Sequence, residues 1–253
     1  MPTPFSHLAV AQRLLEEPTL AANQRSLLHR ELGAFLLGSV AADARIEAGA
    51  PRAATHFYEY SQSMADEMPW EAMMRLNPSL WMPYDDAHAA FVAGYVGHLA
   101  MDEIWSRQMV GPHFISRDWA TQQHRWVMLH VILIVMDERD LQTIAAGRGE
   151  ALISACPRAW TPFLPDPDLM RWRDLVAKQL LPGGRSLTLD IFGPRAGRTP
   201  ADLRALLDDP GRMHDALWQY ISRDLLTVTE TAMYAHAVSQ VVAYLSQATI
   251  RVR

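Results

Sequence analysis

One apolar stretch decides the fold: FVAGYVGHLAMDEIW, residues 91–105. It contains His98 and Asp102, and their spacing of four residues places both side chains on one face of a helix. Gly94 and Gly97 would let a second backbone pass close to that helix. The neighbouring residues are too apolar to leave an imidazole and a carboxylate in water. The two groups must therefore be satisfied inside the protein, either by each other or by a metal such as zinc.

The composition predicts a soluble globular protein. Of the 253 residues, 49% are hydrophobic and 20% are charged, which suits one large core and excludes a largely disordered chain. The net charge of -5 offers no basic surface for nucleic acid. Cys156 is the only cysteine, so neither an intrachain disulfide nor a thiolate zinc cluster can form.

The sequence shows no targeting or membrane signal. The first residues lack a basic segment followed by an apolar one, so no signal peptide is expected. The longest apolar run, residues 126–136, is interrupted by His130 and is too short to span a bilayer. We therefore expect a cytoplasmic protein.

Apolar residues recur with helical spacing along the chain, and no segment alternates as a strand would. Caps and Gly or Pro residues predict helices at residues 6–17, 24–48 (ended or kinked at Gly38-Ser39), 85–110, 118–137, 168–181, 200–208 and 213–247 (bent between Thr227 and Thr231). Ser6, Asp85 or Asp86, and Asp118 are the predicted N-caps. The predicted fold is all-α, one domain of residues 1–253, with an irregular Pro- and Gly-rich insertion around residues 157–200.

Three further segments place a possible metal ligand beside small or aromatic residues. His7 lies near the first helix start, Asp43 lies among alanines, and His56 lies between Thr55 and Phe57. Each also has a structural interpretation. His7 would then be an exposed terminal histidine, Asp43 a helix cap or a partner of Arg45, and His56 a partly buried side chain.

Other histidines and a Met/Trp-rich segment are weaker candidates. His88 is interpreted as a surface residue, and His130 as a core histidine with its hydrogen bonds satisfied. Within residues 64–82 the large side chains could form the wall of an apolar cleft, although a stripe of this kind is more often part of a core. These side chains are Met64, Met68, Trp70, Met73, Met74, Trp81 and Met82.

The candidate ligands and their order resemble the zinc-dependent phospholipase C family, an all-helical group related to the S1/P1 nucleases. The resemblance covers about residues 1–110. It consists of Pro4-Phe-Ser-His7, Leu37-Gly-Ser39 leading to Asp43, Thr55-His-Phe57, and Gly94-Tyr-x-x-His98-Leu-x-x-Asp102-Glu-x-Trp105. It implies a multi-helix bundle of the phospholipase C/P1 nuclease type.

The resemblance also implies a zinc site. Asp43, His56, His98 and Asp102 would surround one zinc ion, while His7 and Asp102 would bind a second, with Asp102 bridging the two. The family's later His-x-x-x-Glu pair is absent here, because residue 134, four after His130, is isoleucine. We therefore expect one or two zinc ions. The candidate substitutes for a further site are His113, His124 and Glu138.

The implied reaction is hydrolysis of a phosphoester, in which a metal-activated hydroxide attacks phosphorus. Asp43 and Asp102 are the candidate catalytic residues, and Asp43 would assist proton transfer. The substrate would be a small-molecule or lipid phosphoester; no nucleic acid partner is expected. Two other functions fit the same residues. One is a metal-stabilised helical binding or scaffold protein, and the other is a metal enzyme recruited to a specialised pathway.

Overall fold

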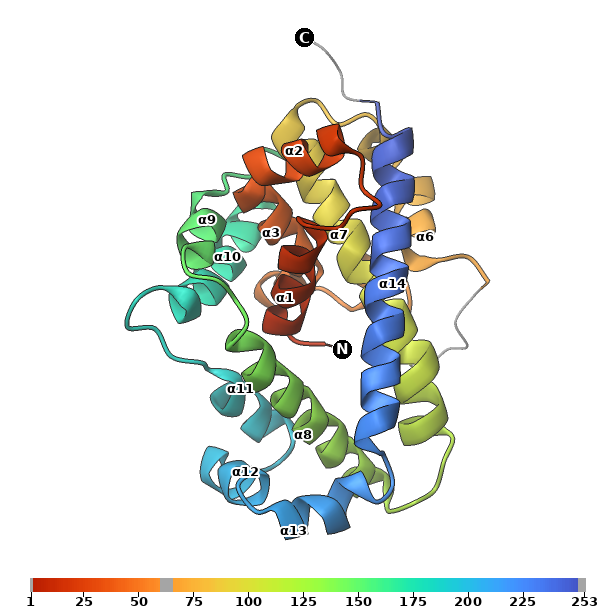
Figure 1. Cartoon of the computed structure of the whole chain (residues 1–253), viewed down its shortest axis with the longest axis vertical. Helices are drawn as coiled ribbons and strands as arrows, with labels where there is room; N and C mark the ends of the chain where they lie inside the picture. The colour runs from red at the N-terminus through yellow and green to blue at the C-terminus, as the bar shows by residue number, and fades with distance from the viewer. Residues whose placement is uncertain (1, 60–65, 250–253) are drawn as a thin grey trace.

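The computed structural model describes residues 2–59 and 66–249, and these contain helices and connecting loops but no β-strand (Figure 1). This confirms the all-α prediction. The helices are α1 (Pro4–Leu14), α2 (Ala22–Arg30), α3 (Leu32–Ala41), η1 (Ala42–Ala44), α4 (Arg45–Ala48), α5 (Ala53–His56), α6 (Pro69–Leu76), η2 (Pro78–Trp81), α7 (Asp86–Ile104), η3 (Trp105–Ile115), α8 (Gln122–Leu141), α9 (Arg148–Ser154), α10 (Asp166–Leu180), α11 (Thr188–Arg195), α12 (Pro200–Leu207), α13 (Pro210–Met213), η4 (His214–Trp218) and α14 (Arg223–Gln247).

The helix predicted from residues 91–105 lies at the centre of the molecule. Every residue of α7 from His88 to Glu103 is buried, and the helix runs between α3 and α14 (Figure 1). The predicted N-cap is confirmed, because the Asp85 side chain accepts a hydrogen bond of 2.8 Å from the backbone N–H of His88. The predicted end before Gly111 was wrong. The chain continues through the π-helical η3, whose wider turn accommodates Pro112.

Helices α3 and α7 cross with their backbones in contact at Gly38 and Gly94. A Cβ atom on Gly94 would overlap the carbonyl oxygen of Phe35 and lie 2.7 Å from the backbone nitrogen of Ser39. One on Gly38 would overlap the carbonyl oxygen of Phe91. The predicted break at Gly38-Ser39 was therefore wrong. These residues lie inside α3, where glycine permits close packing rather than a turn.

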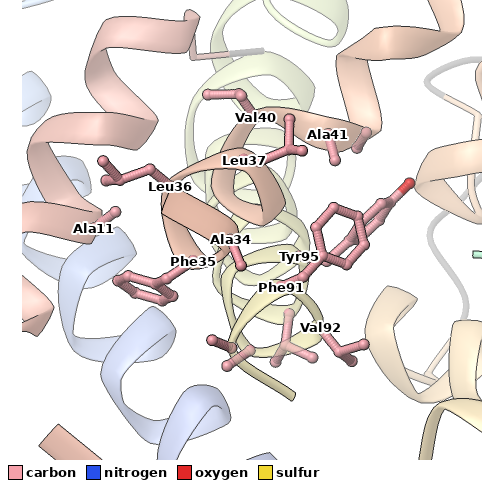
Figure 2. Close-up of a cluster of buried hydrophobic side chains, with 14 of the residues drawn as sticks. Ala11, Ala34, Phe35, Leu36, Leu37, Val40, Ala41, Phe91, Val92 and Tyr95 are labelled. Atoms are coloured by element: carbon pink, nitrogen blue, oxygen red, sulfur yellow. The ribbon is translucent and has the colours of Figure 1, made fainter. Parts of the chain in front are cut away.

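Apolar side chains from both helices surround this crossing. Figure 2 shows Phe35, Leu36, Leu37 and Val40 from α3 together with Phe91, Val92 and Tyr95 from α7, and all of them are buried. Burying side chains of this size stabilises a fold by about 2 kcal/mol each. The packing therefore holds the two helices, and everything attached to their ends, in a fixed relative position.

The Met/Trp-rich segment belongs to this core. Trp70, Met73 and Met74 are buried, and Trp81 packs edge-on against Trp70 with ring centroids 5.9 Å apart. The interpretation of this segment as a cleft wall was therefore wrong for these residues, and the alternative of a plain core was right. Met64 lies outside the described residues.

Several other predicted boundaries differ from the structure. Helix α1 follows Thr3 and not the predicted Ser6, and α8 follows Thr121 and not the predicted Asp118. The segment predicted as one helix at residues 24–48 is divided at Glu31 and at Ala42. Within residues 157–200, α10 corresponds to the helix predicted at residues 168–181, whereas α11 was not predicted. Helix α14 is continuous through residues 227–231, and the C-terminal helical segment is interrupted at residues 219–222 instead. Within residues 2–59 and 66–249, no helix combines the length and hydropathy needed to cross a bilayer.

A buried carboxylate, Asp137 of α8, connects three helices near the start of α1. It accepts a 3.3 Å hydrogen bond from the backbone N–H of Phe5 and another from the hydroxyl of Thr188 at the start of α11. Burial raises the pKa of Asp137 to about 6, although these hydrogen bonds oppose the shift. Asp137 therefore fixes the first turn of the helix that carries His7.

The raised pKa of Asp137 predicts a pH-dependent stability. Because its pKa is higher in the folded state than its ordinary value of 3.8, Asp137 favours folding at low pH, and this contribution is lost as the pH rises through about 6. Asp137→Asn should therefore raise the free energy of unfolding at pH 8 by up to about 3 kcal/mol and flatten its change between pH 4.5 and 8. Urea denaturation measures both. The exposed Asp190→Asn should keep the wild-type profile, and an unchanged profile in Asp137→Asn would contradict the assignment.

Candidate metal centre

The structure brings the five predicted metal ligands into one buried cluster. His7 lies on α1, Asp43 in η1, His56 at the end of α5, and His98 and Asp102 on α7. None of the five is more than 5% exposed. Possible ligand atoms lie within 4.8 Å of one another in two groups: His7, His98 and Asp102, and Asp43, His56 and His98.

The crossing of α3 and α7 explains how the central part of this cluster is assembled. His98 lies four residues after Gly94, so it projects from the same side of α7 one turn beyond the contact with α3. The polypeptide that leaves α3 carries Asp43 directly into the same region. The two glycines thus set the separation between Asp43 and the pair His98 and Asp102.

Three distances between the ligand atoms are close to those of a tetrahedral metal site. Four ligands bound to zinc at about 2.1 Å lie about 3.4 Å from one another. His56 Nε2 lies 3.6 Å from Asp43 Oδ1 and 3.5 Å from Asp102 Oδ2, and His98 Nε2 lies 3.7 Å from Asp102 Oδ2. The second oxygen of Asp102, Oδ1, lies 3.5 Å from His7 Nε2. The two Asp102 oxygens thus face different histidines, as in a bridging carboxylate.

Hydrogen bonds orient two of the imidazoles toward the centre of the cluster. His98 Nδ1 lies 2.9 Å from the carbonyl oxygen of Ser39, which only accepts, so Nδ1 carries the proton and Nε2 keeps a lone pair. His56 Nδ1 lies 2.9 Å from the hydroxyl of Thr55, which itself donates to the carbonyl of Arg52. This pairing leaves Nε2 of His56 as the free acceptor. Such outer hydrogen bonds are typical of metal-binding histidines.

The inward-facing atoms lack hydrogen bonds. In the described part of the chain, no hydrogen-bond partner is present for Nε2 of His7, His56 and His98 or for Oδ1 of Asp43 and Asp102, and all these atoms are buried. Each unpaired buried polar group costs roughly 1–3 kcal/mol. Divalent cations bound by the two groups of ligand atoms would satisfy these atoms, so the residues present fit a zinc site.

The electrostatics favour a cation as well. Burial lowers the pKa of His98 to about 3, and burial together with Arg52 lowers the pKa of His56 well below its usual value. Both imidazoles are therefore neutral at neutral pH. Burial and the Asp102 charge raise the pKa of Asp43, as expected for two carboxylates without enough positive charge between them.

Sequence analysis missed one member of the cluster, Arg52. Its Nη2 lies 3.0 Å from Asp102 Oδ2 and also contacts the hydroxyl of Tyr58, and only 7% of Arg52 is exposed. Burial alone would raise the pKa of Asp102. The pKa of Asp102 is instead held well below its usual value by His98, His7 and Arg52. The single available signal, an arginine four residues before His56 in a loop, does not distinguish Arg52 from a surface arginine.

The other candidate residues do not join the cluster. His88 is buried, contrary to the surface interpretation, and its Nε2 lies 2.9 Å from the carbonyl oxygen of Trp160. His124 Nε2 lies 3.3 Å from the carbonyl oxygen of Ala216, and Glu138 pairs with Arg204. Neither of these two belongs to either group of ligand atoms, and nor does His113.

An open cleft of about 800 Å³ reaches the cluster, with Asp43 and Arg52 in its wall. Much of its lining is apolar and comes from α8, α10 and α11: Trp126, Leu129, Leu133, Trp172, Leu175, Val176, Ile191 and Phe192. Arg45, Arg195 and His130 also line it. His130, predicted to be a core histidine, is 5% exposed; its Nδ1 lies 2.8 Å from the carbonyl oxygen of Trp126.

Comparisons with known proteins identify no relative: no family model matches the chain, and no curated protein or solved structure matches it. A function for this chain must therefore be inferred from the geometry of the cluster and from the sequence motifs that form it.

Proposed function

We propose that this chain is a zinc-dependent phosphoester hydrolase, a phosphodiesterase similar to the zinc-dependent phospholipases C. The observation that carries the proposal is the buried set of His7, Asp43, His56, His98 and Asp102, which forms two groups of ligand atoms within 4.8 Å of one another and has at least one atom without a hydrogen bond on each residue. The cleft beside the cluster gives a substrate access to it. We further propose that the helices form a bundle of the phospholipase C/P1 nuclease type.

The ligand set divides into two parts. Asp43, His56, His98 and Asp102 would hold one ion, and His7 with the other oxygen of Asp102 would hold a second. Zinc at these positions would act as a Lewis acid toward a phosphoryl oxygen. It would also lower the pKa of a bound water molecule to near neutrality.

The chain's own residues provide positioning and proton transfer. Asp43 lies in both the cluster and the cleft wall; one of its carboxylate oxygens faces His56, and the other could exchange a proton beside the substrate. Arg52 also lines the cleft, and its guanidinium is fixed by Asp102. It can therefore donate a charge-assisted hydrogen bond to a phosphoryl oxygen without reorganising.

A second candidate function is a metal-stabilised scaffold without hydrolytic activity. The ion pair between Arg52 and Asp102 favours it, because this pair already gives Asp102 a structural role. The cluster also joins α1, η1, α5 and α7, as a structural metal would. Recruitment of the same site for another metal-assisted reaction is the third candidate.

Metal content and turnover measured together test the proposal. We expect one or two zinc ions per chain by elemental analysis, and hydrolysis of bis(p-nitrophenyl) phosphate that is lost with a chelator and restored by zinc. His98→Gln should weaken zinc binding by roughly a hundredfold, because it removes a ligand from the centre of the cluster. His88→Gln, a buried histidine on the same helix outside the cluster, is the matched control and should bind zinc as wild type does.

Other results would contradict the proposal in different ways. Zinc binding that raises the melting temperature without turnover of any phosphoester would support the scaffold. Hydrolysis that survives complete removal of metal would exclude the zinc mechanism. If the protein binds no metal, the cluster is only a set of buried polar groups and not a metal site.

A further inference from the structure

Two arginines outside the metal cluster face the same cleft. Arg45 is the first residue of α4 and Arg195 is the last residue of α11, so segments 150 residues apart in the sequence line the same cleft. Burial lowers the pKa of Arg195; the Asp43 carboxylate opposes that shift and the Arg45 charge adds to it. Arg195 therefore lies within electrostatic reach of both residues.

Neither arginine has a carboxylate partner among residues 2–59 and 66–249. The Nη1 of Arg45 makes a long 3.5 Å contact with the carbonyl oxygen of Ala50, and its Nε is buried without a hydrogen-bond partner. The guanidinium carbon of Arg195 lies 5.5 Å from the centroid of the Phe192 ring. By contrast, Arg139 and Arg204 each pair with a glutamate. Two like charges with open donors beside one cleft are the arrangement that binds an anion.

The acidic groups in the cleft do not occupy these two arginines. Asp137 accepts its hydrogen bonds from Phe5 and Thr188, and Glu59 accepts a 3.0 Å hydrogen bond from the backbone N–H of Ala53. Asp43 faces His56 at 3.6 Å inside the cluster. With zinc bound as proposed, the positive charge of the ion would neutralise the Asp43 carboxylate.

We propose that Arg45 and Arg195 form an anion-binding subsite, so that the substrate carries a second negative charge next to its scissile phosphate. This inference rests on the proposed function, because Asp43 links the subsite to the metal cluster. The second charge has two possible sources. It is either the second ionisation of a phosphomonoester or a carboxylate or phosphate on the alcohol part of a diester. In both cases the arginines select against a substrate whose remaining group is neutral or cationic.

Matched substrates test the subsite. On the zinc-loaded protein, we would compare kcat/KM for p-nitrophenyl 2-carboxyethyl phosphate with kcat/KM for p-nitrophenyl propyl phosphate, which has similar size but lacks the second charge. p-Nitrophenyl phosphate, the dianionic monoester, is the other charged substrate. We expect wild type to prefer one of the charged substrates by about tenfold or more, and that substrate identifies the source of the charge.

Arg45→Met and Arg195→Met keep much of each side chain's length and remove its charge. Each should reduce the preference for the charged substrate by about tenfold, since a charge-assisted pair is lost. Arg198→Met removes an exposed arginine that lies three residues after Arg195 and does not line the cleft, and its preference should equal that of wild type. Equal kcat/KM values for charged and neutral substrates, or an unchanged preference in both cleft variants, would overturn the subsite while leaving the hydrolase proposal intact.

If no phosphoester is hydrolysed, the hydrolase proposal fails and binding decides the subsite separately. Titration calorimetry with phenylphosphonate on the same protein is the measurement. Roughly tenfold weaker binding in Arg45→Met and Arg195→Met but not in Arg198→Met would support the anion site. Equal binding by all four proteins would overturn it.

Discussion

Asp102→Asn should reduce phosphodiesterase activity by roughly a thousandfold and remove at least one zinc ion per chain. The two oxygens of Asp102 face His7 on one side and His56 and His98 on the other. Asparagine keeps the shape of the side chain, but it loses the charge and replaces one oxygen with an NH2 group, which does not bind zinc. It also removes the ion pair between Asp102 and the buried guanidinium of Arg52.

The neighbouring residue on α7 provides the matched control. Glu103 is also buried, but it bonds to Arg107 at 2.9 Å and to His236 at 3.1 Å, away from the cluster. Glu103→Gln should therefore keep the wild-type zinc content and activity even if it lowers the melting temperature. Elemental analysis and kinetics on folded protein, checked by circular dichroism, separate loss of metal from loss of structure. Asp102→Asn with full zinc content and activity would contradict the bridging assignment.

Three residues of the cluster could be identified from the sequence because each carried a local conflict, whereas His7 and His56 became candidates only in combination with the others. Asp43, His98 and Asp102 are ionisable groups in segments otherwise made of small or apolar residues, and such groups need a partner inside the fold. The spacing of His98 and Asp102 then fixed their relative direction, since helix geometry depends only on sequence separation. The long apolar helix likewise placed α7 in the core.

Helix ends were harder to predict, because tertiary contacts overrode the local signals. Gly38 is a helix breaker by propensity, yet α3 continues through it because Gly94 of α7 packs against this region. Thr227 and Thr231 also suggested a break, but their hydroxyls bond to the carbonyl groups of Arg223 and Thr227, four residues earlier in α14. The contact between Gly38 and α7 cannot be read from the adjacent sequence, and the two threonine bonds form only when the helix is already continuous.

The cleft could not be predicted for a related reason. Hydrophobic periodicity shows which side of a helix is buried, but not whether it faces the core or a cleft. The stripe of Trp70 and Met73 faces the core, whereas Trp126 and Phe192 face the cleft. The position of Arg52 depends on a loop fold whose partner, Asp102, is 50 residues away.

Gly94→Ala should destabilise the protein by about 3 kcal/mol or more and weaken zinc binding at the same time. The new Cβ atom would overlap the carbonyl oxygen of Phe35 and lie 2.7 Å from the backbone nitrogen of Ser39, so only a shift of a whole helix can relieve the clash. Such a shift moves α3 relative to α7. It would therefore separate Asp43 from His98 and distort the ligand spacing.

Gly97→Ala on the same helix distinguishes this packing effect from a general effect of replacing glycine. Its Cβ atom would meet only side-chain atoms, Val241 Cγ2 at 3.4 Å and Leu14 Cδ1 at 3.9 Å, and alanine favours a helix over glycine by up to about 1 kcal/mol. We expect Gly97→Ala to change stability by less than about 1 kcal/mol and to keep the wild-type zinc affinity. Urea denaturation and zinc titration measure both quantities.

Equal effects of the two substitutions would show that the contact between α3 and α7 does not control the cluster. A large loss of stability in Gly94→Ala with unchanged zinc affinity would show that the ligands adjust independently of the crossing.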